Sequence, residues 1–221
     1  MSPHRVWPKP CLYFSCGHCT KGWARLKIQE TGSIMSGSGE TKRWSKAADF
    51  LGGLPFAAGV FTLIMGAYVG LVAFGNVTDP GTNWAFVQHV LSMDTVGFGD
   101  GPNANVAWRA VTSEPLQVLA YIGVIVWEIA TATALLAGGF MWMRALVKGS
   151  SVKLGRRLAS LGFVMVIALF FLGFLTIGGE FFYMWSSSQW NGTDPAFRNT
   201  VLASIGLFLV HFAKDTKSEA S

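Results

Sequence analysis

The chain has 221 residues, of which 51% are hydrophobic and 13% are charged, and its formal net charge is +5. Soluble domains carry about 25% charged residues, so this composition excludes an ordinary water-soluble protein and indicates a membrane protein. The basic residues cluster in particular segments, which fits membrane orientation and argues against a partner made of nucleic acid.

Four apolar segments are long enough to cross a bilayer, whose hydrocarbon core of about 30 Å takes about 20 helical residues. They run from Leu54 to Gly75, from Pro115 to Trp142, from Leu158 to Gly179 and from Pro195 to Lys214. We therefore predict an all-α, polytopic membrane protein with four transmembrane helices. Residues 1–50 form an N-terminal tail, residues 51–214 the four-helix transmembrane domain, and residues 215–221 a C-terminal tail.

Lysine and arginine gather before the first span, between the second and third spans, and after the fourth. The other two connections contain only Arg109, with Arg198 just inside the fourth span. The positive-inside rule then predicts that both termini are cytoplasmic. Small residues at every fourth position predict close helix packing in two ladders, Thr62/Gly66/Gly70 and Ala130/Ala134/Gly138.

Residues 1–34 contain no apolar run and are predicted to be a disordered tail, or to lie before a translation start at Met35. Three cysteines and a histidine near one another form a set that could hold zinc, namely Cys11, Cys16, Cys19 and His18. No fourth cysteine follows, and we predict no metal site there.

The stretch "SMDTVGFGDG" resembles the carbonyl-lined selectivity filter of a potassium channel through Thr95, Val96, Gly97, Phe98, Gly99 and Asp100. Against that interpretation, Asp94 would place a carboxylate at the deep end of the filter, where burying an unpaired charge is costly. The glycines also fit ordinary turns in an Asn- and Pro-rich loop. A cation channel therefore stays an alternative.

Glu128 lies near the middle of the second span, where an ionisable side chain is expensive and usually faces the bundle interior. Tyr121 lies two turns earlier on the same face, and Thr131 lies close to that stripe. Three residues thus form a candidate intramembrane site for a proton, a cation or a quinone head group. The alternative is a protonated glutamic acid that hydrogen-bonds a neighbouring helix, a form that burial favours.

Residues 84–93 have one apolar face, which predicts a helix lying in the outer membrane interface. His89 with Asp79, Asp94, Asp100 or Asp194 could bind an external cation, although a solvated polar face is the simpler interpretation. Glu180 and Arg198 lie at similar depth on the third and fourth spans, and we predict that they form an ion pair.

Three long motifs carry a resemblance to a known family: "GLVAFGNVTDPGTNWAFVQHVLSMDT", "LQVLAYIGVIVWEIATATALL" and "GFLTIGGEFFYMWSSSQWNGTDPAFR". They resemble the uncharacterised bacterial family of predicted small integral membrane proteins, domain of unknown function 2165. The resemblance extends from about Ala47 to about Phe212. It implies a small multi-pass protein of the bacterial inner membrane, and it implies no mechanism.

No nucleophile with a base and an orienting group is visible, and no phosphate-binding loop of the Walker type. We therefore expect a non-enzymatic interaction or accessory protein of the membrane. Its partners would be the lipid bilayer and either another membrane protein or a second copy of the chain. The alternatives are a cation channel or transporter that uses residues 95–100 and Glu128, and a redox accessory subunit that binds quinone. We predict no resident cofactor, with quinone or a cation as the open possibilities.

Overall fold

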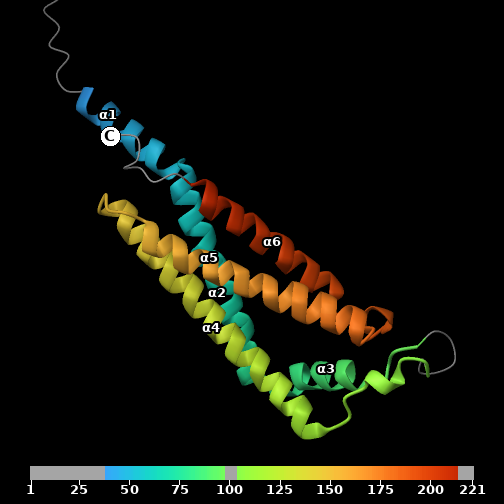
Figure 1. Ribbon diagram of the computed structural model, residues 1–221. Helices are drawn as coiled ribbons and strands as arrows, with labels where there is room; N and C mark the ends of the chain where they lie inside the picture. Colours follow the sequence, from blue (N-terminus) through green and yellow to red (C-terminus); the bar gives the residue numbers. More distant parts are fainter. Residues whose placement is uncertain (1–37, 98–103, 214–221) are drawn as a thin grey trace, which may run out of the picture.

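The computed structural model describes residues 38–97 and 104–213, and every regular element in this part is helical (Figure 1). The elements are α1 (Ser38–Leu51), α2 (Leu54–Thr78), α3 (Pro80–Ser92), η1 (Ala107–Arg109), α4 (Glu114–Val147), α5 (Lys153–Ile167), η2 (Ala168–Phe181), η3 (Met184–Ser186) and α6 (Thr193–Phe212). The predicted all-α fold is confirmed.

Four helices are long and apolar enough to cross a membrane within these described residues, which confirms the four predicted segments. They are Leu54–Thr78, Glu114–Val147, Lys153–Phe181 and Thr193–Phe212. The second extends five residues beyond Trp142, and the third begins five residues before Leu158. Both additions lie at the end of the bundle where basic residues gather. Long cationic side chains on a terminal turn can reach water along an apolar helix, so the helices can continue there.

Helix α1 lies in the segment that was predicted to be a tail, and only Gly52 and Gly53 separate it from α2. Pro55 occupies the first turn of α2. A proline lacks the backbone N–H and disfavours helical conformation in the residue before it, so a new helix starts here and α1 cannot continue.

The four long helices pack in chain order, α2 along α4, α4 along α5, and α5 along α6. In Figure 1, α2 and α6 lie close together at the end near α1 and separate toward the other end, where α3 lies. We call the end that carries α1 and the connection 148–152 the terminal end. The capped end carries α3, residues 104–113 and residues 182–192.

Glycines bring α4 and α5 into backbone contact. A Cβ atom on Gly138 would lie 2.6 Å from the backbone nitrogen of Ala159, and one on Gly155 would lie 2.6 Å from that of Trp142. Farther along, a Cβ atom on Gly206 of α6 would lie 2.3 Å from the ring of Phe163. These separations are shorter than real Cβ contacts, so the helices approach this closely only because the residues are glycine.

The predicted ladder on α2 is confirmed, since Thr62 and Gly66 are buried and Gly66 faces Leu135 of α4. The ladder on α4 is wrong apart from Gly138, because Ala130 is exposed and Ala134 is only half-buried. The buried face of α4 instead alternates steps of three and four residues through Thr131, Leu135, Gly138 and Trp142. One helical turn holds about 3.6 residues, so residues spaced four apart rotate gradually around the helix axis. Such a row does not keep facing the same neighbouring helix.

At the terminal end, Arg156 joins three helices. Its guanidinium donates a hydrogen bond to the backbone carbonyl of Ala213, directly after α6, and lies 5.4 Å from the ring centre of Trp142 on α4. A cation at a helix C-terminus complements the helix dipole, and its stacking on an aromatic ring adds to this. Arg156 therefore fixes the end of α6 against α4 and α5.

The third span changes from α-helix to π-helix at Ala168, and this change was not predicted from the sequence. The hydroxyl of Thr176 donates to the carbonyl of Phe171, and the amide of Phe182 donates to the carbonyl of Ile177, both five residues back. π-Helical segments are rare and are frequently found at functional sites. Here the π-helical part supplies Phe170 and Phe174 to the cleft described below.

Candidate functional site: a polar cleft at Glu128

Glu128 lies in the interior of the bundle, where its side chain is 3% exposed. One carboxyl oxygen accepts a hydrogen bond from the side-chain amide of Asn76 on α2, at 2.6 Å. The Tyr121 hydroxyl donates to the backbone carbonyl of the same Asn76, at 2.7 Å. Asn76 therefore links the two candidate residues on α4 to α2.

Thr131, the third candidate in the second span, is not part of this cluster. It is fully buried, and its hydroxyl donates to the carbonyl of Trp127 in its own helix, at 2.7 Å. A threonine that satisfies itself within its own helix is a packing residue, and it does not line the cleft.

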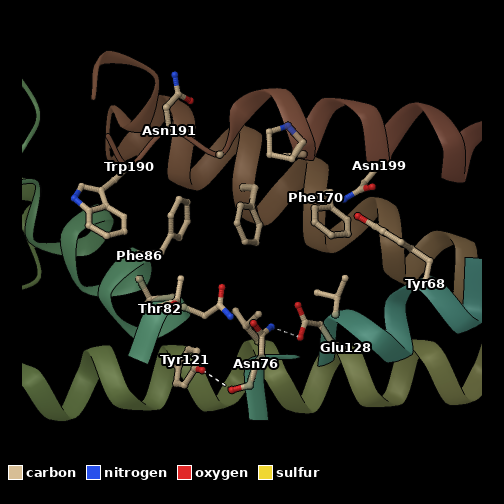
Figure 2. Close-up of a pocket in the computed structure, with 18 of the residues that line it drawn as sticks. Tyr68, Asn76, Thr82, Phe86, Tyr121, Glu128, Phe170, Trp190, Asn191 and Asn199 are labelled. Atoms are coloured by element: carbon tan, nitrogen blue, oxygen red, sulfur yellow. Dashed lines mark hydrogen bonds between the residues drawn. The ribbon is translucent and has the colours of Figure 1, made fainter. Parts of the chain in front are cut away.

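Beside Glu128 the bundle contains a cleft of about 470 Å³, which Figure 2 shows in close-up. Its walls come from α2, α3, α4, η2 and α6 and from the segment before α6. Aromatic side chains form much of the lining, including Phe86, Phe170, Phe174, Trp190 and Tyr68. Polar residues lie where the cleft reaches the capped end, namely Thr82, Asn83, Gln189 and Asn191. Ligand sites combine mostly apolar walls with a few polar groups in this way.

Asn199 of α6 also lines the cleft, and Figure 2 shows it on the opposite side from Asn76. Its residue is only 6% exposed, yet its side-chain amide makes no hydrogen bond to any residue that the structure describes. The amide atoms themselves are open to the cleft, so a ligand or water in that space can hydrogen-bond them.

A second, apolar pocket of about 300 Å³ adjoins the cleft at the capped end. The two share the side chains of Phe86, Val87, Val124 and Phe174, and the apolar pocket continues between α3 and η2 to Ile177. Together they form a polar chamber at Glu128, an aromatic middle section and an apolar extension.

His89 and Asp94 are brought together near the rim. The Nδ1 atom of His89 lies 2.8 Å from a carboxylate oxygen of Asp94, and the imidazole stacks on Trp190 with ring centres 4.6 Å apart. Asp79 instead accepts a hydrogen bond from the hydroxyl of Thr82 at 3.0 Å. Within the described ranges no three His, Cys, Asp or Glu side chains are grouped as for a metal ion.

The predicted ion pair between Glu180 and Arg198 is wrong. Both side chains are exposed, and among the residues described the ion pair formed is that of His89 with Asp94. The sequence indicates that the two residues have similar depth, but the direction in which each helix turns its side chain decides whether they meet.

The start of the filter-like stretch is built into the capped end. The hydroxyl of Thr95 lies 2.9 Å from that of Ser187, and Val96 is buried with Met93, Val106, Phe182 and Met184. Gly97 follows them, whereas Phe98, Gly99 and Asp100 lie outside the described residues. The cysteines Cys11, Cys16 and Cys19 and the histidine His18 also lie outside them.

A family model described as "Predicted small integral membrane protein (DUF2165)" matches residues 54–213. The chain belongs to this family. No curated protein and no solved structure matches the chain. The matched region begins with α2 and ends after α6, so it encloses the four long helices and the whole cleft.

Two residues of the site, Asn76 and Asn199, were not predicted from the sequence. Asn76 falls one residue beyond the predicted end of the first span, and Asn199 lies inside the predicted fourth span, Pro195 to Lys214. The available signal was an amide side chain in or beside an apolar span, because such groups seek hydrogen-bond partners within the bundle.

Proposed function

We propose that this protein is a non-enzymatic membrane protein that binds one lipophilic ligand in the cleft, with Glu128 as the polar anchor. The observation that carries this proposal is the amide of Asn199, which opens onto the cleft with no hydrogen bond to a described residue, across from the Asn76–Glu128 hydrogen bond. Polar groups that face each other across a space of about 470 Å³ favour an occupant between them.

The free-energy cost of placing Glu128 inside the membrane also supports a binding role. Placing an acidic residue at the centre of a transmembrane helix costs about 2.5–3.5 kcal/mol on insertion scales. The bundle does not need this residue for close approach of α2 and α4, because Gly66 and Gly139 already bring these two helices together. Intramembrane ionisable groups are usually retained for function, and a ligand that uses the carboxyl group gives such a reason.

The shape of the space favours an amphiphile. A head group with hydrogen-bonding or charged atoms fits the chamber at Glu128, and an apolar part fits the aromatic section and the pocket between α3 and η2. Four polar residues give the cleft a hydrophilic opening at the capped end, namely Thr82, Asn83, Gln189 and Asn191. A protein of this kind would serve as a carrier, sensor or accessory subunit.

We also propose that the terminal end faces the cytoplasm of a bacterial cell and that α3 lies in the opposite interface of the inner membrane. Basic residues at the terminal end support this orientation, namely Arg144, Lys148, Lys153, Arg156 and Arg157. In this orientation the polar rim of the cleft opens toward the outer face of the membrane.

The direct test is the amount of lipophilic small molecule that the purified protein retains. We expect an organic extract of protein purified in mild detergent to contain about one such molecule per chain, identified by mass spectrometry. Glu128→Leu should lose it, because the anchor is gone. The matched control is Glu114→Gln, an exposed acid in the first turn of the same helix, which should retain it.

Equal retention by wild type and Glu128→Leu would contradict the proposal, as would a wild-type extract that contains only the lipids found with any membrane protein. Asn199→Trp adds an independent check, because its indole would fill the cleft without removing the acid. It should also lose the ligand.

A further inference from the structure

Two hydrogen-bond donors beside Glu128 are already in use. The side-chain amide of Asn76 donates to Glu128, and the hydroxyl of Tyr121 donates to the backbone of Asn76. What remains at this point of the cleft is the second carboxyl oxygen. Figure 2 shows the carboxyl group between Asn76 and the open part of the cleft. Once it has lost its proton, the carboxyl group therefore offers the head of the ligand an acceptor that carries a negative charge.

The aromatic walls have the same electrostatic preference. Phe86, Phe170, Phe174 and Trp190 line the space beyond Glu128, and the face of an aromatic ring attracts positive charge. Phe86 and Phe174 stack at 6.1 Å, and Phe170 lies 5.6 Å from Phe174, so the rings form one continuous surface. Aromatic surfaces of this kind bind quaternary ammonium groups.

No lysine, arginine or histidine is among the described residues that line the cleft. An anionic head group, such as a phosphate or a fatty-acid carboxylate, would therefore lack a counter-ion in the described lining. A neutral carbonyl compound such as a quinone can accept a hydrogen bond from the amide of Asn199, and the neutral probe below tests that alternative.

Resting on the proposed function above, we propose that the ligand is a lipophilic cation, a quaternary ammonium or phosphonium ion with apolar substituents, and that its binding displaces the proton of Glu128. In the empty cleft the carboxyl group is protonated, because a lone carboxylate in the membrane is costly. When the cation binds, the proton leaves to water and the carboxylate pairs with the cation. The cleft then holds no net charge in either state.

Glu128 is the only acidic side chain in the described lining of the cleft, so we assign the proton exchange to it. Tyr68 and Tyr121 are the further ionisable side chains in that lining. The elements around the cleft carry more charges that do not line it: Asp79, His89 and Asp94 around α3, Glu180 on η2, and Asp194 and Arg198 on α6.

Tetraphenylphosphonium is the probe for this inference, added to the full-length protein in mild detergent. We expect it to bind wild type with release of about one proton per cation, measured by calorimetry and by a pH indicator in weak buffer. Its affinity should fall as the pH is lowered, by up to about tenfold per unit, because protons compete for the same carboxylate. This pH dependence tests the inference in wild type alone.

Glu128→Gln should bind the cation about thirtyfold more weakly or worse, the low end for losing one member of a buried charge pair, and should release no proton. Glu114→Gln should behave as wild type. Binding without proton release, or equal binding by Glu128→Gln, would overturn the inference.

A neutral probe separates this inference from the proposed function. If a short-chain quinone binds in a manner that depends on Glu128 while tetraphenylphosphonium does not bind, the cation inference fails and the binding function stands. If neither probe binds and no ligand is retained on purification, both fail.

Discussion

Gly138→Leu is expected to destabilise the bundle by about 3 kcal/mol or more, whereas Gly123→Leu on the same helix should be tolerated. A Cβ atom on Gly138 would lie 2.6 Å from a backbone nitrogen of α5, and a helix backbone cannot move aside as a flexible side chain can. Gly123 has no heavy atom within 4 Å of such a Cβ, so leucine there only extends toward lipid.

The measurement is the free energy of unfolding in mixed micelles of mild detergent and dodecyl sulfate, followed by far-ultraviolet circular dichroism. The same substitution is made on the same helix, so differences in helix propensity largely cancel between the two variants. Equal stability of Gly138→Leu and Gly123→Leu would show that α4 and α5 do not meet as closely as the structure describes.

Asn76→Leu is expected to destabilise the protein by about 1–3 kcal/mol, because Glu128 would keep a buried carboxyl group without its donor. Replacing both partners is different. The double variant Asn76→Leu/Glu128→Leu should be within about 1 kcal/mol of wild type or more stable, because two apolar side chains of suitable size leave no polar group unsatisfied. The pair is therefore expected to be strongly non-additive.

The control for this comparison of single and double variants is Asn83→Leu at the rim of the cleft. The Asn83 side chain is only half-buried and makes no hydrogen bond in the described part of the chain. It should change the free energy of unfolding by less than about 0.5 kcal/mol. If the double variant is as unstable as the sum of the single variants, then Asn76 and Glu128 contribute to stability separately and the cleft does not depend on their contact.

A stable double variant that no longer binds ligand would separate folding from function. It would show that the bundle folds without its acid and that Glu128 is retained at a cost in stability. Proteins commonly carry such costs at binding sites.

The long helices could be predicted from the sequence because apolar length alone decides whether a segment can cross a membrane. Glu128 and Tyr121 could be predicted as candidates for a related reason, since the bundle must accommodate an acid in mid-span, and both line the cleft. The partner of Glu128 could not, because pairing with Asn76 depends on how α2 and α4 are rotated against each other.

Other features could not be predicted from the sequence pattern, for reasons that are local to each of them. Apolar residues continue without a break from the end of α5 into the π-helical segment Ala168–Phe181, so no residue marks the change. The packing face of α4 follows Leu135, Gly138 and Trp142 rather than Ala130 and Ala134, since several small residues compete for the contact. Asn199 stands out only once Glu128 and the aromatic walls surround the same space.

The central claim is that the interior of this bundle has an accessible polar cleft at Glu128, and thiol accessibility tests it most directly. In a chain with Cys11, Cys16 and Cys19 replaced by serine, Asn199→Cys and Ala203→Cys are compared for their rates of reaction with N-ethylmaleimide in membranes. Both positions are buried on α6, one turn apart, but only Asn199 lines the cleft. We predict that Asn199→Cys reacts much faster than Ala203→Cys, which is 0% exposed. Equal, negligible reaction at both positions would contradict the account.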